Sequence, residues 1–146
     1  MACSSPATSP AGCASVDPPV AAPPLAEDVL YQWVGIDAEG ATSGLRVRAD
    51  GRVERQRRGH DWEALATVSS EALAPLRAAV AVVHDGAWAR PVPVDGGSAQ
   101  WVQVRRDDGV HRLYLGPGCE VDELKPLFEA AAGVAAAARP PAAGRP

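Results

Sequence analysis

Apolar and polar residues alternate along two stretches of this chain in the pattern of β-strands. A first strand is predicted at residues 29–36, and a glycine-rich loop separates it from a hairpin with strands at 45–48 and 52–55. A second hairpin turns at Asp108-Gly109. Aspartate followed by glycine between alternating segments is typical of a hairpin turn.

The turn of the first hairpin contains Gly51. The number of residues in this turn decides which residues of the two strands lie opposite each other. A three-residue turn with Gly51 left-handed sets Val47 opposite Val53, whereas a two-residue turn sets Val47 opposite Glu54. We predict the three-residue turn, because it pairs two apolar residues on one face.

The same test gives the opposite result for the second turn. A two-residue turn at Asp108-Gly109 pairs Val104 with Leu113, whereas a three-residue turn pairs Val104 with Arg112. We therefore predict the two-residue turn, which also sets Val102 opposite Leu115.

Two amphipathic segments predict helices. Ser69 or Ser70 caps the first helix, which ends near residues 84–86, and Asp122 caps the second, which runs to about residue 138. The buried faces are Leu73, Leu76, Val80 and Val83 in the first helix, and Leu124, Leu127, Phe128, Ala131 and Val134 in the second. The fold class predicted is α+β in the order ββ(β)αββα, an antiparallel sheet of two hairpins plus an N-terminal strand with both helices on one face.

The ends of the chain differ in composition from this central part. Residues 1–26 are rich in Pro, Ala and Ser and predict a disordered tether, and residues 139–146 predict a short disordered tail. Residues 27–138 form the single predicted domain. The net charge of -4 argues against a nucleic-acid partner, and no apolar run is long enough to cross a bilayer.

The chain contains three cysteines. Ala2-Cys3 resembles the last residues of a bacterial lipoprotein signal whose start is missing, so Cys3 is a candidate lipidation site and the cell envelope a candidate location. If Met1 is the true start, Cys3 is an ordinary residue of the tail and the location is the cytoplasm. Cys13 and Cys119 would pair in an oxidising compartment, or each would remain a free thiol.

The predicted strands carry Arg and aromatic residues on the face away from the helices. These residues are Trp101, Gln103, Arg105, Arg112 and Tyr114 on the second hairpin, and Arg46 and Arg48 on the first. The predicted register sets Arg105 opposite Arg112 and Glu54 opposite Arg46. Such a face is a candidate contact surface for a protein or an anionic partner, although antiparallel sheets ordinarily show charged residues to water.

A second candidate surface is the long connection between the first helix and the second hairpin. It presents Trp88 and Arg90, and the nearby Pro91 and Pro93 would stiffen it. The alternative is that Trp88 folds back onto the core, as a lone Trp often does.

The sequence offers little for catalysis. His60, His84 and His111 are scattered and lack the spacing of a metal site, so we expect no cofactor. A thiol activity at Cys119 or a histidine activity at His60 is a minor alternative. No second cysteine lies close to Cys119 in the sequence, and although Asp61 could orient the His60 imidazole, no nucleophile can be assigned to it.

Two family resemblances follow from these segments. The hairpin Leu45-Arg-Val-Arg-Ala-Asp-Gly-Arg-Val53 followed by Val68-Ser-Ser-Glu-Ala-Leu-Ala-Pro-Leu76 resembles uncharacterised bacterial lipoprotein domains, which implies no known activity. The layout from Ser69 to Ala131 is similar to the emfourin inhibitors of thermolysin-like metalloproteases, but the Gly-Gly-Phe-like N-terminal segment of that family is absent.

We therefore expect a non-catalytic, envelope-tethered domain that binds an envelope or secreted protein. The alternatives are a metalloprotease inhibitor and a purely structural lipoprotein.

Overall fold

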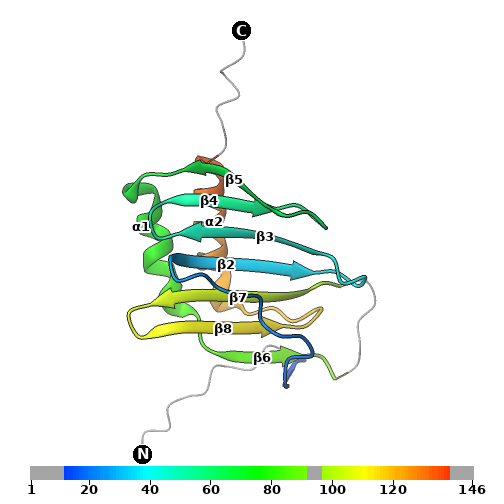
Figure 1. The fold of residues 1–146 in the computed structure, drawn as a ribbon. Coiled ribbons are helices and arrows are strands. Elements are labelled where there is room, and N and C mark those ends of the chain that lie inside the picture. The colour runs from blue at the N-terminus through cyan, green and yellow to red at the C-terminus, as the bar shows by residue number, and fades with distance from the viewer. Residues whose placement is uncertain (1–11, 92–96, 139–146) are drawn as a thin grey trace, which may run out of the picture.

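The structure, a computed structural model, describes residues 12–91 and 97–138. It forms one mixed sheet, with two helices packed on the same face (Figure 1). The strands are β1 (Ala14–Ser15), β2 (Val29–Ile36), β3 (Thr42–Arg48), β4 (Arg52–Gln56), β5 (Trp62–Thr67), β6 (Gly86–Ala89), β7 (Ala99–Arg106) and β8 (Gly109–Leu115). The helices are α1 (Ser70–Ala79) and α2 (Lys125–Ala137), with short 3₁₀ turns at Val80–Val82 and Asp122–Leu124.

The α+β class is confirmed, but the sheet is larger than two hairpins and one strand. Its order is β1-β6-β8-β7-β2-β3-β4-β5. The strands β1, β5 and β6 were not predicted, and β6 pairs with β8 in parallel while the other pairs are antiparallel. The sequence did not reveal β6 because its four residues, Gly-Ala-Trp-Ala, do not alternate clearly.

The first hairpin has the predicted register. Val47 lies opposite Val53, and Arg46 lies opposite Glu54. Gly51 has a φ of 97°, and a Cβ there would lie 2.3 Å from the carbonyl oxygen of Val68. Only glycine fits this turn without strain, since a side chain would both adopt a left-handed backbone and meet that carbonyl.

The register of the second hairpin was predicted wrongly by two residues. Val102 lies opposite Leu113, and Arg106 lies opposite Gly109, so that the turn is Asp107-Asp108. The guanidinium of Arg106 donates hydrogen bonds to the carbonyls of residues 80, 81 and 83, which holds β7 against the end of the first helix. A shift of two residues keeps every side chain on its face, so hydrophobic pairing could not distinguish the two registers.

The two helices begin differently. Ser69 caps α1 as predicted, and its hydroxyl accepts a 3.1 Å hydrogen bond from the amide of Ala72. The predicted cap at Asp122 is wrong: that residue opens a 3₁₀ turn, and no side chain caps α2. Pro126 occupies the first turn of α2, where it removes one of the amide donors that a cap would satisfy.

The main core lies between the sheet and the helices. Val47, Val53, Val102, Val104 and Leu113 contribute from the sheet, and Leu73, Leu76, Leu127, Ala131 and Val134 contribute from the helices. Most of the predicted helix positions are buried, and Phe128 is partly buried. No helix in the described ranges has the length and hydrophobicity needed to span a membrane.

The N-terminal segment gives the largest difference from the sequence analysis. Residues 12–28 do not form a free tether: they cross the opposite face of the sheet, from β1 at one end to the start of β2 (Figure 1). We call residues 12–28 the strap and the sheet face that it crosses the outer face. The rest of the predicted tether, residues 1–11, and the predicted tail, residues 139–146, lie outside the described residues.

Candidate binding surface on the outer sheet face

The strap divides the outer face into two halves. It covers the strands β6, β8, β7 and β2, which we call the covered half. The strands β3, β4 and β5 form the open half. The candidate residues of the second hairpin belong to the covered half, and Arg46 and Arg48 belong to the open half.

Aromatic residues form the apolar part of the covered half. Trp101 and Tyr114 lie on neighbouring strands with their rings 5.3 Å apart in an edge-on arrangement. Val16 and Ala22 of the strap pack against them, so that Trp101 is only 5% exposed and Tyr114 only 3% exposed. Burial raises the pKa of the Tyr114 hydroxyl. These residues share the predicted face, but that face is not open to solvent here.

Two buried glutamines hold the strap by its carbonyl oxygens. Gln103 donates to the carbonyl of Pro23 at 3.0 Å, and Gln32 donates to that of Pro24 at 3.2 Å. Gln32 also donates to the Oε1 atom of Gln103 at 3.3 Å. Buried amides need such partners, so this contact fixes where the strap lies.

Arg105 holds the strap near its C-terminal end. Its Nη2 atom donates to the carbonyl of Ala26 at 3.2 Å. Arg105 lies opposite Val110, and Arg112 lies opposite Gln103, so the predicted pairing of Arg105 with Arg112 is wrong. Arg112 is exposed, and its backbone amide donates to Asp85 at 2.6 Å.

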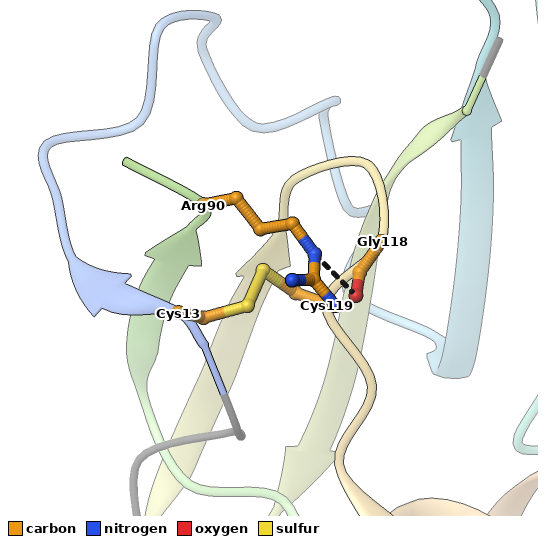
Figure 2. Close-up of a disulfide and its surroundings, with 4 residues drawn as sticks. All are labelled: Cys13, Arg90, Gly118 and Cys119. Atoms are coloured by element: carbon orange, nitrogen blue, oxygen red, sulfur yellow. Dashed lines mark hydrogen bonds between the residues drawn. A yellow bond between two sulfur atoms is a disulfide. The ribbon is translucent and has the colours of Figure 1, made fainter. Parts of the chain in front are cut away.

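A disulfide between Cys13 and Cys119 fixes the other end of the strap (Figure 2). It is the pairing that the sequence analysis weighed against free thiols. Arg90 extends beside the disulfide, and its Nε atom donates to the carbonyl of Gly118 at 3.1 Å. Arg90 therefore belongs to the anchor of the strap.

The Trp88 connection is not a free loop over its described part. Trp88 belongs to β6, where it lies between Ser15 on β1 and Leu115 on β8, and it packs against the core. This is the alternative considered for a lone Trp. Pro93 belongs to the segment 92–96, which lies outside the described residues.

The open half carries a continuous network of charged side chains. The Oε1 atom of Glu54 accepts hydrogen bonds from Arg46 and Arg48, each at 2.8 Å. Arg48 continues to Asp28 at 2.5 Å, and Arg52 contacts Asp28 at 3.0 Å. Arginines and carboxylates alternate along the network, so its charges are nearly balanced.

The environment of Glu54 sets its ionisation. Burial alone raises the pKa of this carboxyl, but the hydrogen bonds from Arg48 and Arg46 outweigh it and lower the pKa below its usual value of 4.5. Glu54 is therefore a fixed negative charge between two arginines.

Trp62 covers one end of the open half. The guanidinium of Arg46 stacks on its ring, 4.2 Å from the ring centroid. Trp62 also lies close to the backbone of β3: a Cβ at Gly44 would lie 2.8 Å from Cη2 of Trp62. Trp62 and Arg46 thus form a rigid aromatic and cationic platform, which we call the Trp62 platform.

Three residues of the outer face were not predicted from the sequence: Trp62, Gln32 and Asp28. Gln32 carried a usable signal, because it is a polar residue inside an apolar strand. No sequence signal placed Trp62 on this face, because the strand β5 that contains it was not predicted.

The helix face offers a different kind of site. An apolar hollow of about 380 Å³ lies beside α2 and is lined by Tyr31, Trp33, Leu45, Gln100, Phe128, Ala131 and Ala132. Burial raises the pKa of Tyr31 at its floor. The hollow is lined by apolar and uncharged polar side chains, and Tyr31 is its titratable group.

The histidines and acids do not assemble into a reaction centre in the described part of the chain. His111 contacts Asp108 at 2.8 Å and Asp85 at 3.4 Å beside the β7–β8 turn. No group of three His, Cys, Asp or Glu side chains among the described residues could hold a metal ion. Cys119, the alternative thiol nucleophile, is in the disulfide.

Comparisons with known proteins found no match: no family model, no curated protein and no solved structure is similar to this chain.

Proposed function

We propose that this chain is a non-catalytic domain that binds an envelope or secreted protein through the open half of its outer sheet face. The Trp62 platform carries this proposal. It offers a large, rigid aromatic ring and a guanidinium whose position is already fixed, so little side-chain entropy is lost on binding. Trp and Arg are the residues that most often dominate the energy of protein interfaces.

The charge pattern supports a protein as the partner more than an anionic polymer. Arg46 and Arg48 both contact Glu54, and Arg48 and Arg52 both contact Asp28. Each arginine therefore already has a carboxylate beside it, which leaves little net positive charge to attract a polyanion. A partner with its own mixed polar surface complements such a network better.

The end strand β5 adds a second means of contact. It forms one end of the sheet, and it pairs only with β4 among the described strands. It contains neither Lys nor Pro, the residues that commonly protect an exposed strand edge. A partner strand can pair with β5 while its side chains reach the Trp62 platform.

The disulfide supports a location in an oxidising compartment, because such bonds persist mainly outside the cytoplasm. In a bacterium that compartment is the cell envelope. A lipid on Cys3 would attach the chain to a membrane there, and residues 4–11 would connect the lipid to the strap.

Capture of partners from envelope extract by the immobilised full-length chain tests the proposal. We compare the wild type with Trp62→Ala, and we use Phe128→Ala as the matched control because it also removes a partly buried aromatic ring, but on the helix face. A partner held by the wild type and by Phe128→Ala, and lost with Trp62→Ala, supports the open half. Equal capture by all three, or loss with Phe128→Ala alone, contradicts it.

If the partner is a metalloprotease, its activity should fall at near-stoichiometric amounts of the wild-type chain. Trp62→Ala should then fail to inhibit it. Inhibition that survives this substitution would place the inhibitory contact elsewhere.

A further inference from the structure

We propose that the covered half is a docking site for a proline-rich segment of another protein chain, and that the strap is its built-in occupant. The disulfide then decides which of the two segments occupies the site. This proposal concerns the covered half alone and does not depend on the open half.

The covered half presents hydrogen-bond donors to whatever lies over it. The Oε1 atom of Gln32 accepts from Arg46 at 3.4 Å, and the Oε1 atom of Gln103 accepts from Gln32. Because both amide oxygens are engaged within the sheet, each amide nitrogen donates one hydrogen to the strap, Gln32 to Pro24 and Gln103 to Pro23. Arg105, which has no acceptor atom, provides a further donor.

The strap matches this surface because its prolines offer carbonyl acceptors without N–H donors. Pro18, Pro19, Pro23 and Pro24 lie within it, and each proline has a carbonyl but no N–H. Two of the three carbonyls that the face binds belong to Pro23 and Pro24. A regular strand laid here would bring N–H groups that these donors cannot satisfy. The face therefore selects proline-rich chain.

The strap does not use every donor of the face. Nε1 of Trp101 and Nε of Arg105 are buried, and neither has a hydrogen-bond partner among the described residues. An unsatisfied buried donor is costly, so a segment with carbonyls at these two positions would bind better than the strap does. These two unpartnered donors support a different occupant independently of the hydrogen bonds that the strap already makes.

The strap is also held in a way that permits exchange. Beyond the two-residue strand β1, the strap contacts the strand β6 through the backbone hydrogen bond from Val16 to Ala87. Most residues from 17 to 28 are at least partly exposed, including Val20 at 42%. The bond between Cys13 and Cys119 is a covalent hold on the N-terminal end of the strap.

A dithiol reductant would release this end. Its two thiols become a disulfide as the bond between Cys13 and Cys119 breaks, and each cysteine becomes a thiol. Arg90 lies beside the bond, where its positive charge favours a thiolate (Figure 2). The strap then remains attached at Val29, but no covalent bond to Cys119 holds it in place, so other segments can compete with it for the covered half.

The test traps a segment in trans on the full-length chain. The chain carries Cys3→Ser and Cys13→Ser, so that Cys119 is its only thiol. The probe is a fluorescent synthetic peptide with the sequence of residues 12–28, whose own cysteine forms a disulfide with Cys119 when the peptide docks. Trapping is measured on non-reducing gels in a buffer of oxidised and reduced glutathione. The oxidised glutathione takes up the two electrons and two protons that the peptide thiol and the Cys119 thiol lose, and it becomes two glutathione thiols. The attached strap competes with the peptide at an effective concentration of about millimolar.

We expect this peptide to be trapped about tenfold faster than a scrambled peptide that keeps the cysteine at the same position. A peptide with Pro23→Ser and Pro24→Ser should also be slower, because it brings amide donors to a face of donors. The chain with Gln32→Ala and Gln103→Ala in addition should lose the preference. A chain that carries Cys3→Ser alone, with the bond between Cys13 and Cys119 closed, should trap neither peptide.

Equal trapping of the native and scrambled peptides would overturn the proposal. It is also overturned if the serine-substituted peptide reacts as fast as the native one. In both comparisons only the peptide changes and the chain stays the same. They therefore decide the question even if the glutamine variant fails to fold.

Discussion

Gln32 and Gln103 lie 71 residues apart in sequence and face each other across β2 and β7, with the amide of Gln32 3.3 Å from the oxygen of Gln103. Both side chains are fully buried, although they lie on the face of the sheet away from the helices. They are buried because the strap crosses over them. One hydrogen-bonded pair therefore links the open half, through Arg46, to the segment that covers the other half.

Replacing Gln103 should destabilise the fold. Gln103→Leu removes the donor to Pro23 and leaves the amide of Gln32 with one partner fewer, so we expect a loss of about 1–3 kcal/mol in the free energy of unfolding. Urea denaturation measures it. Gln56→Leu is the matched control, because the bond from Gln56 to the His60 carbonyl is exposed, and its change should stay within about 0.5 kcal/mol. Equal losses would show that the buried pair has no special role.

The disulfide should contribute to stability and to the protection of the strap. It closes a loop between residues 106 apart, so Cys13→Ser with Cys119→Ser should lower the free energy of unfolding by about 2–5 kcal/mol. Hydrogen exchange should rise first in residues 16–28, while β2 and β7 remain protected. Uniform exchange over the whole sheet would contradict a strap that opens separately.

Glu54 should make stability depend on acid pH. The pKa of Glu54 in the folded chain lies below its usual value of 4.5, so its contribution is complete above about pH 4.5 and is lost as the pH falls through the folded value. Glu54→Gln should be less stable than the wild type at pH 7 and should lose less stability between pH 5 and pH 3. Thermal unfolding at several pH values measures this. Parallel curves for the two proteins would contradict the network.

The turn at Gly51 should tolerate no side chain. Gly51→Ala combines a left-handed backbone with a clash at the Val68 carbonyl, whereas Gly40→Ala shares the positive φ but meets nothing within 4 Å. Gly40→Ala should cost about 1 kcal/mol. Gly51→Ala should cost clearly more in the same denaturation experiment. Equal costs would show that the turn can move away from Val68.

The sequence was sufficient for features that depend on neighbouring residues. The first hairpin register followed from the pairing of Val47 with Val53, and the α1 cap followed from Ser69. Both are decided within a few residues, where turn geometry and capping chemistry act.

The features that were not predicted correctly depend on contacts between residues distant in sequence. Arg106 reaches the end of the first helix, and this contact accompanies the two-residue shift of the second hairpin. The strap looked disordered by composition, because prolines and alanines bury little surface of their own. What orders it are donors on Gln32, Gln103 and Arg105, which no local pattern connects to Pro23 and Pro24. The candidate residues of the second hairpin do share one face of the sheet, but the segment that covers this face could not be predicted.

The most direct measurement of the proposed function is a hydrogen-exchange footprint of the full-length chain with and without its captured partner. If the partner binds the open half, amide exchange should slow in β5 and in the parts of β3 and β4 around the Trp62 platform. Exchange in α2 should not change. Slower exchange confined to α2 and the strands that line the hollow beside it would contradict the account and place the partner on the helix face.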